Sequence, residues 1–481
     1  MNLKKWFVLV VAALALAACG DDSSTGGGGG SAGNDPDNPE SSGSNDPSNP
    51  TSSDIEWVLP NDPSNLWKGA GTEESPYELN NEEDLLTLMD EVNSKSVNFK
   101  GTVFKLTADV SLSKKWTPIG CVKGQGNRTF GGTFDGGNHT IKGLSVDDTI
   151  TYAGLFGYVS GDASAKAVIR NVTLDGASIK AGSYMGMLFG KAEHAEIKNV
   201  SVKGTVTGND FVGGLGGSLS NGTVETATVN GTVQGSGSVS GVVSTAISSK
   251  IISANNLAAV TGKSTVAGIV ATLSMNSSIE LCVNKGNISG SSDVGGIVGK
   301  ASQVEVKQSG NEAAVTGEDN ATSNVGGVVA VASNSAVLNQ VYNTGAITAK
   351  NVLSVGGIAG KFVTEASMTS AFNQGQVTAE GNTNAGGLIG KAETCKVTGA
   401  YNAGVVSAIA NAGSIAGAHL STSEMVSVYY DAATKVAPTE LGEASEAMKT
   451  AEFLAALNAV ENAWTMAGDK YAGFPFFTWI K

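Results

Sequence analysis

The chain has 481 residues, of which 64 are glycine and only 6% are aromatic. Its 44 acidic residues outnumber 30 lysines and arginines, for a net charge of −14, and this balance argues against nucleic acid as a partner. Four cysteines and three histidines match no metal-binding spacing, so neither a metal nor a cofactor is predicted.

Residues 1–18 have the pattern of an export signal. Lys4 and Lys5 precede an apolar run too short to span a bilayer, and the run ends in Leu16-Ala-Ala-Cys19. This ending resembles the lipobox of bacterial lipoproteins, and the resemblance implies that Cys19 carries the acyl chains of a membrane anchor. We therefore expect an outer-membrane lipoprotein exposed at the cell surface. The alternative is an ordinary secreted protein in which Cys19 occurs by chance.

Residues 19–54 are predicted to be a lipidated, disordered tether. The segment contains no lysine, arginine or large apolar residue, so it cannot bury enough surface to fold. A flexible chain of this length reaches about 30–35 Å, which would hold the folded part clear of the membrane.

Residues 55–150 are predicted to form an N-terminal cap and the first coils of a repeat. Asn80 and Asn81 are followed by three acidic residues, which favours the start of a helix. We expect this helix to cover the open end of the first coil. Its apolar face would consist of Leu85, Leu88, Met89 and Val92.

Residues 151–420 repeat a five-residue cassette with the pattern small, glycine, aliphatic, apolar, small. Ten copies follow one another at intervals of 27 to 33 residues, which is typical of a solenoid whose coils cannot bury their apolar faces alone. Three short strands per repeat predict an all-β chain folded as a three-sided, right-handed parallel β-helix, with short capping helices at both ends. The copies begin at Ala153, Gly186, Gly213, Ser240, Ala267, Gly295, Gly326, Gly356, Gly386 and Gly413.

The cassette itself is interpreted as one strand, for example 294–300, followed by strands near 304–308 and 313–317. Alternation along a strand directs the aliphatic third position, here Ile297, into the core and the fourth, here Val298, outward. The fourth position is nevertheless mostly apolar. Either a bulge turns both side chains inward, which we favour, or an apolar stripe is exposed for a partner.

Six successive coils carry an asparagine four residues before an aliphatic residue. Stacked asparagines can hydrogen-bond from coil to coil, so we expect a structural ladder, and a row of ligand contacts is the alternative. Next to three of them lie aromatic residues that form either a stack in the core, which we favour, or a binding platform for sugar rings. The asparagines are Asn256, Asn284, Asn311, Asn343, Asn373 and Asn402, and the aromatic residues are Tyr342, Phe372 and Tyr401.

Residues 421–481 are predicted to be a C-terminal cap. A helix is expected from Ser445 to Asn458, and the aromatic residues that follow are expected to plug the end of the solenoid. These residues are Trp464, Phe474, Phe476, Phe477 and Trp479.

Several of these segments resemble GLUG-motif repeat proteins. The resemblance rests on 116–120, on 132–144, on the repeated Gly-Gly-Leu/Ile-x-Gly and on the aromatic C-terminus, and it covers residues 66–481. It implies a bacterial cell-surface β-helix of an adhesin-like or protease-associated kind. The copies at Ser240 and Ala267 depart from the double glycine of the motif.

No catalytic cluster is predicted, because the acids of the coils are scattered singly and the chain has only two arginines. Cys282 falls at an inward position and is expected to be a buried thiol. We therefore expect a protein that is not an enzyme, but an adhesin-like, lipid-anchored rod that binds a polysaccharide or a surface protein. The alternatives are a β-helix enzyme acting on extracellular glycans and a structural spacer that binds nothing.

Overall fold

The computed structural model describes residues 65–120, 128–381, 383–434, 436, 443–445, 447–466 and 468–480, with 443–445 and 470 described by backbone alone. The chain divides into two units, 1–56 and Trp57–Lys481, and every described residue belongs to the second. The predicted signal peptide, Cys19, the tether and Cys121 lie outside the described residues.

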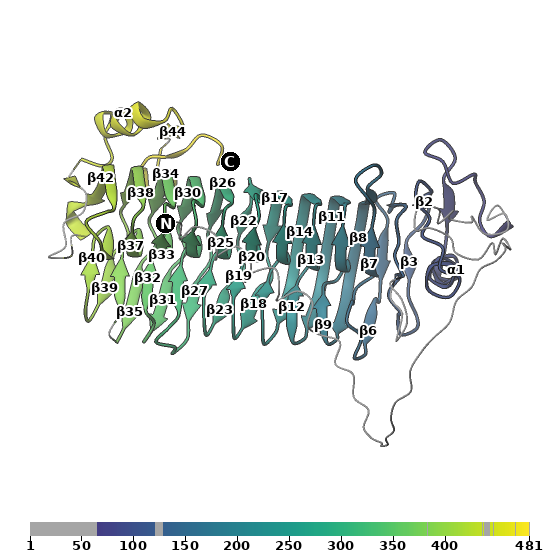
Figure 1. Cartoon of the computed structure of the whole chain (residues 1–481). Coiled ribbons are helices and arrows are strands. Elements are labelled where there is room, and N and C mark those ends of the chain that lie inside the picture. Colours follow the sequence, from purple (N-terminus) through teal and green to yellow (C-terminus); the bar gives the residue numbers. More distant parts are fainter. Residues whose placement is uncertain are drawn as a thin grey trace, which may run out of the picture. The chain divides into compact units, whose positions relative to one another are not determined.

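The second unit is a parallel β-solenoid (Figure 1). Strands of successive coils pair in parallel in three sheets, which we call the nine-stranded, the ten-stranded and the large sheet. The predicted all-β, three-sided parallel β-helix is thereby confirmed. The coil that begins at Val294 contributes one strand to the nine-stranded sheet, one to the ten-stranded sheet and two to the large sheet.

The strands fall into the sheets as follows. The nine-stranded sheet contains β9 (Ser183–Met185), β12 (Asp210–Gly213), β15 (Val239–Ser240), β19 (Val266–Ala267), β24 (Val294–Gly295), β28 (Asn324–Gly326), β32 (Ser354–Gly356), β36 (Asn384–Gly386) and β40 (Ala412–Gly413). The ten-stranded sheet contains β7 (Phe156–Ser160), β10 (Phe189–Glu193), β13 (Gly216–Ser220), β16 (Val243–Ile247), β20 (Val270–Ser274), β25 (Val298–Ser302), β29 (Val329–Ser333), β33 (Ala359–Val363), β37 (Ile389–Glu393) and β41 (Ala416–His419). The large sheet contains β1 (Tyr77–Leu79), β2 (Val103–Leu106), β3 (Val110–Ser111), β4 (Thr133–Asp135), β5 (Thr140–Lys142), β6 (Ser145–Asp147), β8 (Ala167–Lys180), β11 (Ala195–Thr207), β14 (Thr223–Gln234), β17 (Lys250–Asn256), β18 (Ala259–Gly262), β21 (Ser278–Glu280), β22 (Val283–Asn284), β23 (Ile288–Gly290), β26 (Glu305–Asn311), β27 (Val315–Gly317), β30 (Val337–Asn343), β31 (Ile347–Lys350), β34 (Ser367–Asn373), β35 (Val377–Glu380), β38 (Lys396–Asn402), β39 (Val406–Ala408), β42 (Glu424–Asp431) and β43 (Glu443–Ser445).

The cassette forms a corner between two sheets, so its interpretation as one strand is wrong. In the coil that begins at Val294, β24 ends at Gly295 and β25 begins at Val298 in another sheet. Because the chain turns between them, both Ile297 and Val298 are fully buried. The fourth cassette position therefore belongs to the core, as favoured from the sequence, and does not form an exposed apolar stripe.

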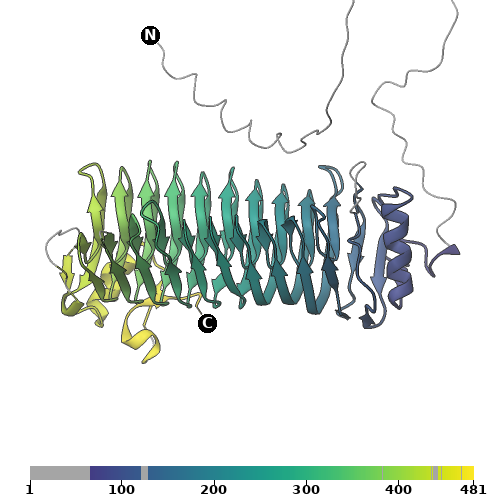
Figure 2. The same ribbon diagram turned by 90° about the horizontal axis from the view of Figure 1, so that it is seen from below.

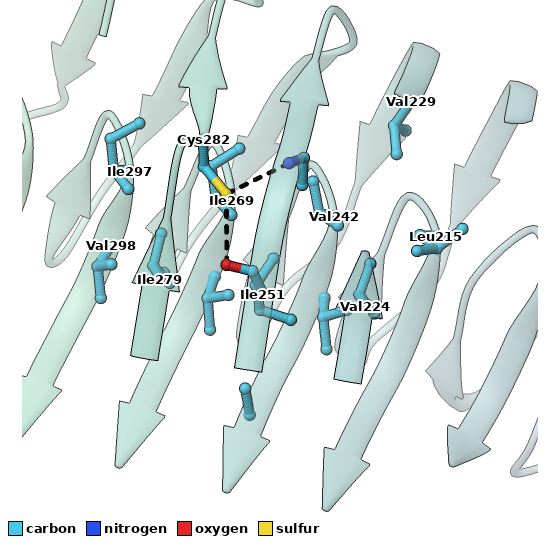
Figure 3. Packing of buried hydrophobic residues seen from close by; sticks show 14 of the residues in the cluster. Leu215, Val224, Val229, Val242, Ile251, Ile269, Ile279, Cys282, Ile297 and Val298 are labelled. Atoms are coloured by element: carbon cyan, nitrogen blue, oxygen red, sulfur yellow. Dashed lines mark hydrogen bonds between the residues drawn. The ribbon is translucent and has the colours of Figure 1, made fainter. Parts of the chain in front are cut away.

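Aliphatic side chains of successive coils stack along the interior (Figure 3). Leu215, Val242, Ile269 and Ile297 occupy the third cassette position of four consecutive coils, and all are fully buried. Cys282 lies among such side chains as a free thiol, which confirms its predicted burial. That burial raises the pKa of Cys282 to about 12, so the thiol stays protonated and unreactive at neutral pH.

The N-terminal end of the solenoid carries the helix predicted there, α1 (Glu82–Asn93) (Figure 2). The side-chain oxygen of Asn81 accepts hydrogen bonds from the backbone N–H groups of Glu83 and Asp84 at 2.9 and 3.1 Å, which satisfies donors that the helix leaves free. Leu85 and Leu88 are buried in the same hydrophobic core as the coils. The prediction of a helix beginning after Asn81 is confirmed.

The C-terminal segment lies on the side of the solenoid, so the predicted plug is wrong (Figure 1). Helix α2 (Ala451–Val460) begins later than expected and is capped by the Thr450 side chain. It is followed by the antiparallel pair β44 (Trp464–Thr465) and β45 (Phe476–Phe477). Apolar residues of this segment pack against the outer side of β30, β34 and β38. The remaining short helices are η2 (Ala432–Thr434) and η3 (Lys470–Gly473).

Neither of the two α-helices in the described part of the chain is long and apolar enough to cross a membrane.

Candidate functional site

The six asparagines stack inside the solenoid as a hydrogen-bonded ladder. From Asn256 to Asn402, each side-chain amide donates to the side-chain oxygen of the asparagine in the next coil, at 2.7 to 2.8 Å. The same nitrogen also donates to a backbone carbonyl two residues further on, as from Asn343 to Gly345 at 2.9 Å. All six side chains are 0% exposed. They therefore bond to one another and to their own turns, out of reach of a ligand in solution.

The second cassette position is glycine in these coils because the ladder lies against it. A Cβ atom on Gly296 would lie 2.6 Å from Cγ of Asn311, and one on Gly327 would lie 2.5 Å from Cγ of Asn343. Both distances are too short for real carbon atoms. The repeated glycines and the repeated asparagines thus pack against each other across the coil.

Tyr342, Phe372 and Tyr401 stack on the outer side of the same strands. Their ring centroids are 5.3 and 5.5 Å apart and their planes lie within 15° of parallel. Since Asn343 faces inward, strand alternation turns the adjacent Tyr342 outward. All three rings are nevertheless 0% exposed, because the C-terminal segment covers them.

The cover over this stack is itself aromatic. The rings of Phe477 and Trp464 lie 5.3 and 6.1 Å from that of Phe372, and the Tyr401 hydroxyl donates to the backbone carbonyl of Pro475. Burial raises the pKa of Tyr401 far above its ordinary value. The three residues proposed as a binding face thus form the surface on which the C-terminal segment docks, and they lie neither in the solenoid core nor on an open platform.

A second set of aromatic side chains lies partly exposed on the first coils, and the sequence interpretation missed it. Tyr152, Tyr184 and Phe211 occupy one position of three successive coils. Their ring centroids are 5.5 and 4.3 Å apart, and the last two rings lie within 10° of parallel. Tyr158, which is buried, extends the set at 5.6 Å from Tyr152. We call these four residues the aromatic row.

A signal for the row was present in the sequence. Tyr152 directly precedes the cassette that begins at Ala153, while Tyr184 lies two residues before Gly186 and Phe211 lies two residues before Gly213. The repeat of aromatic residues just ahead of the cassette therefore marked one outward column of the solenoid.

A charged pair adjoins the aromatic row. The Lys191 ammonium lies 4.7 Å from the ring centre of Tyr158 and 2.9 Å from a carboxylate oxygen of Glu193, and the Tyr158 hydroxyl donates to Glu193. Burial, together with this hydrogen bond, raises the pKa of Tyr158 to about 12. Burial alone would raise the pKa of Glu193, but the hydrogen bonds from Tyr158 and Lys191 outweigh it and lower that pKa. At neutral pH the site therefore presents a hydroxyl, a carboxylate and an ammonium group beside the rings.

Two hollows lie elsewhere on the coils. One of about 580 Å³ is lined by Lys250, Asn276, Gln303 and Asn334, among others. The other, of about 160 Å³, is lined by Asn138, Asn171 and Asn199, of which Asn199 donates to Asn171 at 2.9 Å. Among the residues that the structure describes, no three histidine, cysteine, aspartate or glutamate side chains gather closely enough to hold a metal ion.

These features define a parallel β-solenoid repeat protein with outward columns of aromatic and polar side chains. No family model matches the chain. Over 158 residues, or 30% of its length, the chain is 34% identical to Halomucin of Haloquadratum walsbyi. It spans only 2% of the length of that relative.

Two solved structures are similar over most of the chain. One, from Bacteroides ovatus and provisionally described as an immunoglobulin A1 protease, is 16% identical, with 86% of this chain and 96% of that chain covered and a TM-score of 0.30. The other, described as IgA1 protease, is 14% identical, with 80% of this chain and 24% of that chain covered and a TM-score of 0.36. These names contradict the expectation that the chain is not an enzyme, and that expectation is withdrawn. At this level of similarity they assign no reaction to it.

Proposed function

We propose that this chain is a lipid-anchored, cell-surface β-solenoid that works as an adhesin-like rod and binds a polysaccharide or another surface protein. The observation that carries the proposal is the aromatic row beside Lys191 and Glu193, which is partly exposed at Tyr152, Tyr184 and Phe211. Rings and charged groups presented together on a rigid scaffold are typical of recognition surfaces.

The N-terminal and family resemblances support a surface location. The lipobox-like ending at Cys19 suits an outer-membrane lipoprotein, and the resemblance to GLUG-motif proteins suits a bacterial surface β-helix. The stretch similar to Halomucin fits a repeat-containing surface protein.

The solenoid also presents its outer side chains at a regular spacing. Successive coils repeat about every 4.8 Å, and each pairs in register with the next, as Lys191 does with Tyr158 and Ser218. Such columns suit a partner that is itself a polymer of similar units.

Binding of the purified full-length chain to a panel of immobilised partners tests the proposal. The panel would hold cellulose, xylan, pectin, chitin, mucin and collagen, with heat-unfolded chain as the control. We expect saturable binding of the folded chain to at least one member. Absence of binding to every member would contradict the adhesin-like function and favour a spacer. Sizing the polymers after incubation would show in the same experiment whether the chain cleaves any of them.

A further inference from the structure

We infer that the aromatic row is a polysaccharide-binding site in which a pyranose ring stacks on the outer face of Phe211. This inference rests on the proposed function, since it names the ligand class and the residues of the binding surface. It is carried by the end of the row at Phe211 and by the charged groups around it.

The backbone is strained at two of the four rings. Tyr184 and Phe211 both have φ near +52°, a left-handed conformation that is unusual for bulky side chains. The residues on either side pair in register, Ser183 with Asp210 and Met185 with Val212, so Tyr184 lies opposite Phe211 and both strands take the left-handed conformation at the same place. The same conformation recurs elsewhere in the coils, for example at Leu281 and Gln308, so it limits which residues can replace the rings and does not by itself mark a ligand site.

The row stops at Phe211. The register of β12 with β15 pairs Val212 with Val239 and places Ser238 opposite Phe211 in the next coil. Tyr184 covers one side of the Phe211 ring at 4.3 Å, whereas the next coil supplies a serine in place of a ring. The apolar C–H face of a pyranose ring would continue the stack at the spacing of about 4.8 Å between coils.

Polar groups border the rings on both sides. Lys191 and Asp210 both lie near enough to Tyr184 to influence its pKa, which burial raises, and Asp210 is exposed. An apolar protein partner would strip water from these charges without replacing its hydrogen bonds, which is unfavourable. The hydroxyl groups of a sugar can donate to Asp210 and Glu193 and accept from Lys191.

The other aromatic column shows how this chain covers rings with protein. Over Tyr342, Phe372 and Tyr401 the cover consists largely of apolar and aromatic side chains, and the rings are fully buried. Three rings of the aromatic row, all but Tyr158, instead remain partly exposed, and the row is bordered by Lys191, Glu193 and Asp210. This contrast favours a hydroxyl-rich ligand over a polypeptide segment.

Substitution by asparagine removes a ring while suiting the backbone, because asparagine tolerates the left-handed conformation. The test measures the affinity of the full-length chain for soluble laminarin, xylan and pectin by affinity electrophoresis, with circular dichroism and melting temperature as folding controls. Phe211→Asn and Tyr184→Asn are the test variants. Leu281→Asn is the matched control, since Leu281 has φ +55° and is also an exposed apolar residue at a left-handed position.

We expect Phe211→Asn to weaken binding of the recognised polysaccharide by about tenfold or more, the scale of a lost stacking contact. Tyr184→Asn should also weaken it, and Leu281→Asn should bind like wild type. Wild-type affinity in folded Phe211→Asn and Tyr184→Asn would overturn the inference but leave the proposed function standing. Binding of the wild-type chain to a protein partner but to no polysaccharide would also overturn the inference and leave the proposed function standing. If the wild-type chain binds nothing in either panel, both proposals fail.

Discussion

Inside the repeat, each buried asparagine of the ladder packs against a glycine. The ladder begins where Asn256 lies against Gly241 and ends where Asn402 lies against Gly387, and a Cβ on either glycine would come within 2.4 Å of the asparagine Cγ. The sequence predicted both the glycines and the asparagines as repeats. It did not predict that they touch, because that contact crosses the interior of the coil and depends on where the corners fall.

Asn343→Ala tests how much the ladder contributes to stability. The change leaves the Asn311 amide and the Asn373 oxygen without their partners on that side. We expect the free energy of unfolding to fall by about 1–3 kcal/mol, the effect of leaving buried polar groups unsatisfied. Denaturant unfolding of the full-length chain measures it.

The control for this change is an asparagine on the outside of the solenoid. Asn230 in β14 is exposed, so Asn230→Ala should alter stability by no more than about 0.5 kcal/mol. Equal unfolding midpoints for Asn343→Ala and Asn230→Ala would show that the ladder adds nothing.

At the scale of elements, one outward column contains polar side chains in the early coils and aromatic side chains in the late coils. The column that holds Tyr342, Phe372 and Tyr401 holds Thr173 and Ser201 in earlier coils. The aromatic part coincides with the coils that the C-terminal segment covers. The sequence contained this signal, since Tyr342 next to an inward Asn343 must face outward. The docking itself could not be predicted, because contacts such as that from Tyr401 to Pro475 join distant parts of the chain.

Glu461 holds the end of α2 to the solenoid. One of its carboxylate oxygens accepts from Gln340 at 2.8 Å and the other from Ser370 at 2.6 Å. Glu461→Ala removes both hydrogen bonds, and bonds to a charged group contribute about 1.5–3 kcal/mol each when well formed. We expect faster amide hydrogen exchange in residues 451–480, with exchange in the coils unchanged.

The matched variant is Glu452→Ala, which removes an exposed carboxylate from the first turn of the same helix. Its exchange rates should stay close to wild type. If amide hydrogens of residues 451–480 exchange as slowly in Glu461→Ala as in Glu452→Ala, the aromatic contacts hold the segment without Glu461.

At the scale of the whole molecule, the spacing of the repeats was sufficient to predict a parallel β-solenoid. Each coil must return the chain to its starting edge within 27 to 33 residues, and parallel pairing of such coils gives three sheets. The strand boundaries were not predictable by alternation, because alternation assumes a straight strand and the cassette turns a corner at Gly296 and Ile297. The aromatic row was overlooked for a related reason: Tyr184 and Phe211 have positive φ values, so they do not follow the regular alternation of a strand.

Attachment of the whole chain to the membrane is predicted to depend on Cys19. One acyl chain gives only marginal binding, at about 0.8 kcal/mol per buried CH₂ group, and two or more chains give a stable anchor. Cys19→Ser removes the thiol that the lipobox resemblance assigns to this modification. We expect the variant to lose incorporation of labelled palmitate and to move from the membrane fraction to the soluble fraction.

Cys282→Ser is the control for that experiment, because it also exchanges one cysteine for serine. Cys282 is a buried free thiol whose backbone N–H donates to the Ser309 hydroxyl oxygen in the next coil at 3.1 Å. Serine already fills this column at Ser309, so the solenoid should tolerate it at 282 and the variant should remain in the membrane fraction. If Cys19→Ser stays in the membrane fraction after a carbonate wash, the anchor lies elsewhere and the lipoprotein prediction is wrong.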